Sequence, residues 1–150
     1  MLNEDDRDML RALSEEKVRF LLVGAYALAA HGYLCATIDM DIWIMPSADN
    51  AEAVLRALRR FGAPLGDLTS EDLQKESTIF QIGVAPRRSD IITAVSGLNF
   101  DQAYQHSLLI NIQGIEVRLP SLDDLIINKK ATGRTKDLAD AEALASLPRE

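Results

Sequence analysis

The stretch "LLVGAYALAAHGYLCATIDMDIWI", residues 21–44, holds two aspartates one residue apart in otherwise apolar surroundings. Its first part belongs to "VRFLLVG", which predicts a buried strand that ends at Gly24. Small helix formers follow from Ala25 to His31, and Gly32 then stands where a helix C-cap glycine is expected. The stretch therefore predicts a strand, a tight turn, a helix and a second strand, in that order.

The second strand, "TIDMDIWI" at residues 37–44, alternates strictly, which places Thr37, Asp39, Asp41 and Trp43 on one face. Two aspartates at positions i and i+2 of a strand lie roughly 7 Å apart and point the same way. They repel each other unless a cation neutralises them, and a pair of Mg²⁺ ions about 4 Å apart is a common solution. On the Asp-x-Asp alone, a solvated strand face is the more frequent interpretation.

The rest of the chain alternates between helical and extended patterns, which indicates an α/β (α+β) fold. Its 150 residues fit a single domain, 1–150. We expect helices at 4–14, 48–61, 70–77 and 100–104, strands at 78–84 and 89–95, a hairpin over 108–119 that turns at Gln113-Gly114, and two last helices at about 121–132 and 136–146.

Composition and charge exclude several classes of function. Hydrophobic residues make up 47% and charged residues 26%, and the net charge of −7 disfavours non-specific binding to nucleic acid or to an anionic membrane. The longest apolar run, "FLLVGAYALAA", is too short to cross a bilayer, and "MLNEDDRDML" lacks the pattern of a signal peptide. With Cys35 as its single cysteine, the chain has no intrachain disulfide framework, and we expect a cytoplasmic protein.

Gly24 adds an anion-binding feature beside the aspartates. A helix that begins directly after a buried strand offers free backbone N–H groups and a positive dipole end to a phosphate. In this combination the sequence resembles the nucleotidyltransferase superfamily, with its polymerase-β-like fold. The signature of that superfamily is a glycine followed by glycine or serine, a short helix, and Asp-x-Asp on the next strand. The resemblance is strongest to small bacterial AbiEii-like and minimal nucleotidyltransferases, which are associated with toxin–antitoxin and phage-defence systems.

Three ordered blocks carry the resemblance over most of the chain. They are "GAYALAAHGYLCATIDMD" (24–41), "GVAPRRSDIITAVSGLNFDQAY" (83–104) with the third carboxylate, Asp90, and "SLDDLIINKKATGRTKDLADAEAL" (121–144), which looks like the C-terminal helix pair. The resemblance implies a mixed β-sheet flanked by helices. It also implies a metal-dependent transfer of an NMP from an NTP to a hydroxyl.

The resemblance also implies roles for individual residues. Asp39, Asp41 and Asp90 would be the metal-binding and catalytic set, for Mg²⁺ or Mn²⁺. Asp90 would also help to draw a proton from the acceptor hydroxyl. The acceptor would be an RNA end such as that of a tRNA, a protein side chain or a small molecule. The nucleotide-binding positions would be Gly24, Ala25, Lys129, Arg134 and Lys136.

The basic residues have two interpretations. Lys129 lies four residues after Leu125 on the inward face of its helix, which suits either contact with a phosphate or snorkelling toward solvent. Lys130, Arg134 and Lys136 form a basic patch or a solvated face paired with Asp137 and Asp140. For His31 a helix-capping role, and for Trp43 a place in the core, are the preferred interpretations over contact with a nucleotide.

Two positions depart from the pattern of the superfamily. Ala25 replaces the usual glycine or serine, and Cys35 stands where closer relatives carry an arginine. These departures favour an alternative: a catalytically weak nucleotide-binding or partner-binding module of antitoxin-like or regulatory type. The chain is also shorter than larger AbiEii-like proteins, so we expect a homo-oligomer or a partner protein to complete the acceptor side.

Overall fold

A four-stranded mixed sheet forms the centre of the protein. The computed structural model describes residues 3–32, 40–83 and 88–148. The strands follow the order β1 (Phe20–Val23), β2 (Met40–Ile44), β4 (Ser89–Ile92) and β3 (Ile79–Ile82). β2 and β4 are parallel, while both outer pairs are antiparallel. The predicted α/β class with a mixed sheet flanked by helices is confirmed.

Two amphipathic helices cover one face of this sheet. They are α1 (Glu4–Glu15) and α3 (Ala48–Phe61), and they pack on the apolar side of β2, whose Met40, Ile42 and Ile44 are fully buried. α3 begins at Ser47, whose side chain accepts a hydrogen bond from the N–H of Asn50, and it ends at Gly62 in the left-handed conformation. Local capping therefore sets both ends of α3, whose range agrees with the helix predicted at 48–61.

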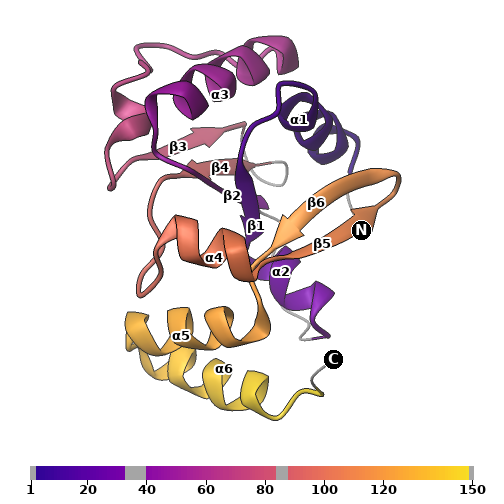
Figure 1. Ribbon diagram of the computed structural model, residues 1–150, viewed down its shortest axis with the longest axis vertical. Helices are drawn as coiled ribbons and strands as arrows, with labels where there is room; N and C mark the ends of the chain where they lie inside the picture. Colours follow the sequence, from indigo (N-terminus) through magenta and orange to yellow (C-terminus); the bar gives the residue numbers. More distant parts are fainter. Residues whose placement is uncertain (1–2, 33–39, 84–87, 149–150) are drawn as a thin grey trace.

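The opposite face of the sheet carries the aspartates and a smaller core beneath α4 (Phe100–His106). This second core contains Leu21, Val23, Trp43, Phe100 and Ala103. Trp43 is 1% exposed, and its ring meets that of Phe100 edge to face with centroids 5.2 Å apart. Its predicted place in the core is confirmed. α3 and α4 thus lie on opposite sides of the sheet (Figure 1).

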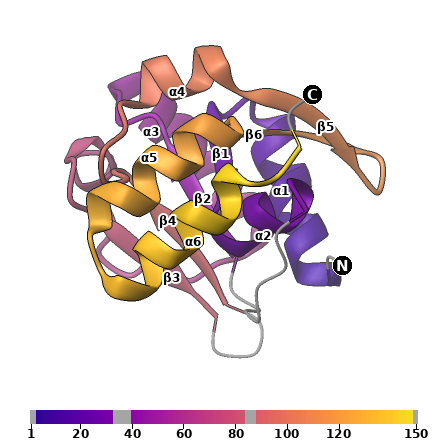
Figure 2. The same cartoon turned by 90° about the horizontal axis from the view of Figure 1, so that it is seen from below.

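A β-hairpin and a helix pair complete the fold. The hairpin of β5 (Leu108–Ile112) and β6 (Ile115–Leu119) lies beside β1 and reaches out as an arm (Figure 2). Gln113 and Gly114 both have positive φ, as a two-residue type I′ turn requires, so the predicted turn is confirmed. α5 (Leu122–Thr132) is capped by Ser121 and ends at Gly133, and α6 (Thr135–Ala145) packs back against it.

Some predicted boundaries differ from the structure. The helix expected at 70–77 is a single 3₁₀ turn, η1 (Asp72–Gln74). Thr69 and Asp72 cap its start through reciprocal side-chain to backbone hydrogen bonds, but Lys75 is extended and the carbonyl of Asp72 accepts a hydrogen bond from the Thr78 hydroxyl. α2 (Gly24–Ala30) begins one residue earlier than predicted, and β4 is shorter than predicted. Within the described ranges, no helix combines the length and apolarity that crossing a bilayer requires.

Candidate active site

Two of the three predicted carboxylates lie side by side on neighbouring strands. In the parallel register of β2 and β4, Asp41 is directly opposite Asp90. Adjacent strands are about 4.8 Å apart, and residues opposite each other point to the same face of the sheet. Asp41 is half-buried and Asp90 is only 9% exposed. The fold therefore brings together two carboxylates that are separated by 49 positions in the sequence.

The third predicted carboxylate, Asp39, lies outside the described residues, as does Cys35. β2 as described begins at Met40. Among the described residues, no three histidine, cysteine, aspartate or glutamate side chains gather closely enough to hold a metal ion. The metal-binding role of the Asp39, Asp41 and Asp90 set stays a prediction.

The Asp41 carboxylate occupies space beside Gly24 that is free only because glycine has no side chain. A Cβ atom built at Gly24 would lie 2.5 Å from Oδ2 of Asp41, far inside van der Waals contact. Gly24 also has φ +69°, a left-handed conformation that costs little only for glycine. The strand-to-helix turn and the close approach to Asp41 therefore both require glycine here. Contact of Gly24 and Ala25 with a nucleotide stays a prediction.

Arg88 supplies a positive charge to the carboxylate pair. Its Nε lies 3.3 Å from Oδ1 of Asp90, and the side chain of Arg88 is 34% exposed against 12% for Asp90. The backbone of Arg88 is fixed to β2, since its carbonyl accepts a hydrogen bond from the N–H of Met40. Sequence reasoning missed this residue. The available signal was its position two residues before Asp90, because residues i and i+2 of an extended strand share a face.

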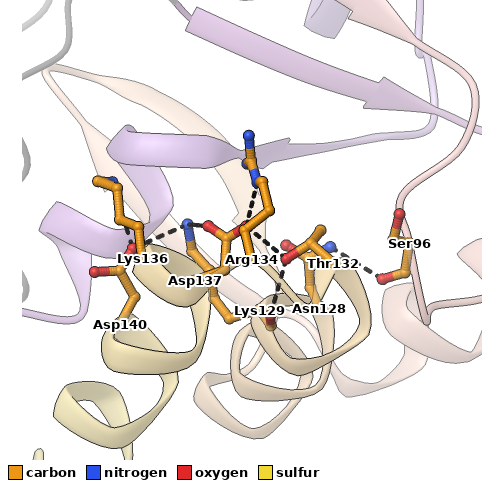
Figure 3. A network of polar contacts seen from close by, with 8 residues as sticks. All are labelled: Ser96, Asn128, Lys129, Thr132, Arg134, Lys136, Asp137 and Asp140. Carbon is orange, nitrogen blue, oxygen red and sulfur yellow. Dashed lines mark hydrogen bonds and ion pairs between the residues drawn. The ribbon is translucent and has the colours of Figure 1, made fainter.

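The basic residues near the C-terminus form an ion-pair network with two buried aspartates (Figure 3). Nζ of Lys129 lies 3.5 Å from Oδ1 of Asp137 and 3.4 Å from Oδ2 of Asp140. Arg134 Nε is 2.6 Å from Oδ2 of Asp137, and Lys136 Nζ is 3.5 Å from Oδ2 of Asp140. For Arg134 and Lys136, the pairing with Asp137 and Asp140, one of the two interpretations from the sequence, is the arrangement found here. The ion pairs of Lys129 with the same two aspartates were not predicted. The nucleotide-binding role of these cations stays a prediction.

The network fixes α5 to α6 electrostatically. Hydrogen bonds from Arg134 and Thr132 to Asp137, followed by the nearby charge of Lys129, lower the pKa of that carboxyl to about 2. Asp137 and Asp140 are 2% and 6% exposed, so both carboxylates depend on these partners for the solvation that burial removes.

The helix pair also contacts the loop that follows β4, the strand of Asp90. Nδ2 of Asn128 donates to the carbonyl of Ser96 at 3.0 Å, which Figure 3 shows beside the network. A Cβ atom at Gly97 would lie 2.6 Å from Cβ of Ala131, so α5 packs directly on this loop. The Ser-Gly pair of the sequence block thus has a structural role in docking α5.

His31 connects the end of α2 to the start of α5. It is the C-cap residue of α2, and its Nε2 lies 3.0 Å from the carbonyl oxygen of Pro120. The predicted capping position is confirmed, and the ring contacts backbone that leads directly into the cap of α5.

Most of the chain is arranged as in a solved structure. The structure superposes on the crystal structure of a "putative nucleotidyltransferase" from Thermotoga maritima with a TM-score of 0.58, covering 93% of this chain and 87% of that chain at 17% sequence identity. The chain has a nucleotidyltransferase-like fold. No protein-family model and no curated protein match the sequence. At 17% identity the likeness establishes the nucleotidyltransferase-like fold and not the AbiEii-like subtype.

Proposed function

We propose that this protein is a metal-dependent nucleotidyltransferase that moves an NMP from an NTP to a hydroxyl. The observation that carries the proposal is the placement of Asp41 directly opposite Asp90 on parallel strands of a nucleotidyltransferase-like fold. Phosphoryl transfer needs positioning and charge neutralisation more than covalent chemistry from the protein. Adjacent carboxylates are suited to that task because they recruit the cations that neutralise a triphosphate.

The donor set fits a hard divalent cation. Asp41 and Asp90 present carboxylate oxygens, which Mg²⁺ and Mn²⁺ prefer, and Gly24 keeps the space beside Oδ2 of Asp41 free of a side chain. We assign Asp39, Asp41 and Asp90 as the residues that hold Mg²⁺ or Mn²⁺. When bound, the metal supplies neutralisation of phosphate charge and a lower pKa for the attacking hydroxyl.

The proposed reaction balances with groups from the donor, the acceptor and the protein. The acceptor oxygen forms a bond to the α-phosphorus of the NTP, and the bond from that phosphorus to the bridging oxygen breaks. Pyrophosphate leaves with the bonding electrons. Asp90, opposite Asp41 and largely shielded from water, takes the proton of the acceptor hydroxyl. Gly24 and Ala25, with Lys129, Arg134 and Lys136, are proposed to contact the nucleotide.

The resemblance to AbiEii-like proteins supports a finer proposal about context. We place the protein in the cytoplasm, in a toxin–antitoxin or defence system. Its acceptor would be an RNA end such as that of tRNA, a protein hydroxyl or a small molecule. A second copy or a partner protein would complete the acceptor side.

One observation favours the alternative of a catalytically weak nucleotide-binding or partner-binding module. Lys129, Arg134 and Lys136 all make ion pairs with Asp137 or Asp140. A phosphate would have to compete with these carboxylates for the same cations, which lowers the affinity expected for a nucleotide. Stabilisation by an NTP therefore separates the transferase from a partner-binding module, and release of pyrophosphate separates it from a catalytically weak nucleotide-binding module.

The test is thermal unfolding with each of the four NTPs, with and without Mg²⁺ or Mn²⁺. A ligand at about 100 times its dissociation constant stabilises a protein by roughly 2.7 kcal/mol. We expect a metal-dependent rise in Tm with at least one NTP, and its loss in Asp41→Asn. Asp67→Asn, an exposed aspartate in a loop, is the matched control and should keep the rise. A folded wild-type protein whose Tm no NTP changes would instead support the partner-binding module.

A further inference from the structure

The ion pair between Arg88 and Asp90 lies inside the carboxylate pair itself. The two atoms that face each other, Nε of Arg88 and Oδ1 of Asp90, are both buried from solvent. Charge pairs removed from water interact more strongly than exposed ones because less solvent screens them. The contact of Arg88 with Asp90 is therefore an energetically significant part of the apo site.

The position of Arg88 explains how the fold tolerates two aspartates in adjacent register. Asp41 and Asp90 are cross-strand neighbours, and like charges at this spacing are destabilising. Arg88 precedes Asp90 by two residues and shares its face of the strand. Its guanidinium offsets part of this repulsion.

A divalent cation on Asp90 would compete with the guanidinium of Arg88. Both are positively charged, and within a few ångströms of each other in a site of low dielectric constant they repel. The Arg88 backbone is fixed to β2, but its side chain is one-third exposed and can rotate about its own χ angles. A guanidinium displaced in this way stays next to the metal site, and its planar fork matches the oxygens of a phosphate.

We propose that Arg88 is an exchangeable counter-ion, an inference that rests on the proposed function. Arg88 pairs with Asp90 in the free protein and with the phosphates of the NTP when a divalent cation binds. Arg88 then opposes metal binding in the absence of nucleotide. With nucleotide present it stabilises the complex, so that metal and NTP bind cooperatively. The residue would thus limit metal occupancy to the nucleotide-bound state.

The experiment is a titration with Mn²⁺ alone, followed by calorimetry and by the electron paramagnetic resonance signal of free Mn²⁺. We compare the wild type with Arg88→Gln and Arg88→Lys. Arg11→Gln is the control for the change in net charge, since Arg11 pairs at the surface with Asp8. We expect Arg88→Gln to bind Mn²⁺ roughly fivefold more tightly than the wild type, because the contact is lost from a pair whose facing atoms are buried while the Arg88 side chain is one-third exposed. Arg11→Gln should bind like the wild type.

A second titration uses the non-hydrolysable α,β-methylene analogues of the four NTPs in the presence of Mn²⁺. Arg88→Gln should bind the preferred analogue more weakly than the wild type. Arg88→Lys should keep wild-type affinity for Mn²⁺ alone, because the charge remains, but lose affinity for the analogue, because the planar fork is gone. Opposite changes in the two affinities of Arg88→Gln are a result that a merely structural arginine would not give.

The outcomes separate the two proposals. If the wild type binds Mn²⁺ and Arg88→Gln binds it equally or less tightly, the counter-ion role is overturned while the metal site stands. If neither protein binds Mn²⁺, either alone or together with any of the NTP analogues, the proposed metal-dependent function fails as well. If circular dichroism shows that Arg88→Gln does not fold, Arg88→Lys provides the test. An affinity of Arg88→Lys for the NTP analogue equal to that of the wild type would overturn the proposal.

Discussion

Replacement of Gly24 by alanine tests the geometry of the site most directly. The new Cβ would lie 2.5 Å from Oδ2 of Asp41, 3.3 Å from its Cγ and 3.4 Å from its Cβ. A left-handed conformation costs a non-glycine residue about 1–2 kcal/mol, and forcing atoms into an occupied space costs about 1–3 kcal/mol more. We therefore expect Gly24→Ala to lower the free energy of unfolding by roughly 2–5 kcal/mol, measured by urea denaturation.

The chain offers a matched control for the cost of placing alanine in a left-handed backbone conformation. Gly66 also has positive φ, but no atom lies within 4 Å of a Cβ built there. Gly66→Ala should therefore cost only about 1–2 kcal/mol. The difference between the two variants isolates the contact with Asp41.

A double-mutant cycle identifies the atom responsible. Asp41→Ala removes the carboxylate that the new methyl group would meet, so in that background Gly24→Ala should cost no more than Gly66→Ala. The reasoning is refuted if Gly24→Ala is as mild as Gly66→Ala in the wild type. It is also refuted if the excess cost persists without the Asp41 side chain.

Three further predictions concern the charged residues. Asp90→Asn should abolish NMP transfer, followed by release of pyrophosphate, while circular dichroism shows a folded protein; unchanged transfer would remove Asp90 from the reaction. Lys129→Met should lower the urea midpoint, because two buried aspartates lose a shared cation; an unchanged midpoint with lost NTP binding would show that Lys129 serves the nucleotide instead. The pKa of Asp137 is about 2 when folded, below the usual value near 3.9 when unfolded, so its contribution to stability should be complete above about pH 4 and fall as the pH drops toward 2. Asp137→Asn should flatten the pH dependence of stability in that window, and an equally steep profile would contradict the assignment.

Local patterns predicted most of the secondary structure. Strict alternation in "TIDMDIWI" placed Asp41 and Trp43 on one face of a strand, and the buried Trp43 lies on the aspartate side of the sheet under α4. Local capping residues set both ends of α3 and α5, whose predicted ranges agree with the structure, because a cap is a contact within four residues of sequence. The helix expected at 70–77 was wrong in length: Thr69 and Asp72 cap its start, but Lys75 is extended and β3 begins at Ile79.

The contacts that make the site are between distant segments, and the sequence carries no measure of register. Alternation shows which face Asp90 occupies on its own strand, but a shift of β4 by one residue against β2 would turn it away from Asp41. The resemblance to nucleotidyltransferases supplied the pairing that periodicity could not. It did not identify Arg88, although the same alternation places Arg88 and Asp90 on one face. A strand that carries a carboxylate should therefore be searched two residues in either direction for a counter-ion, because a buried charge in adjacent register with another requires one.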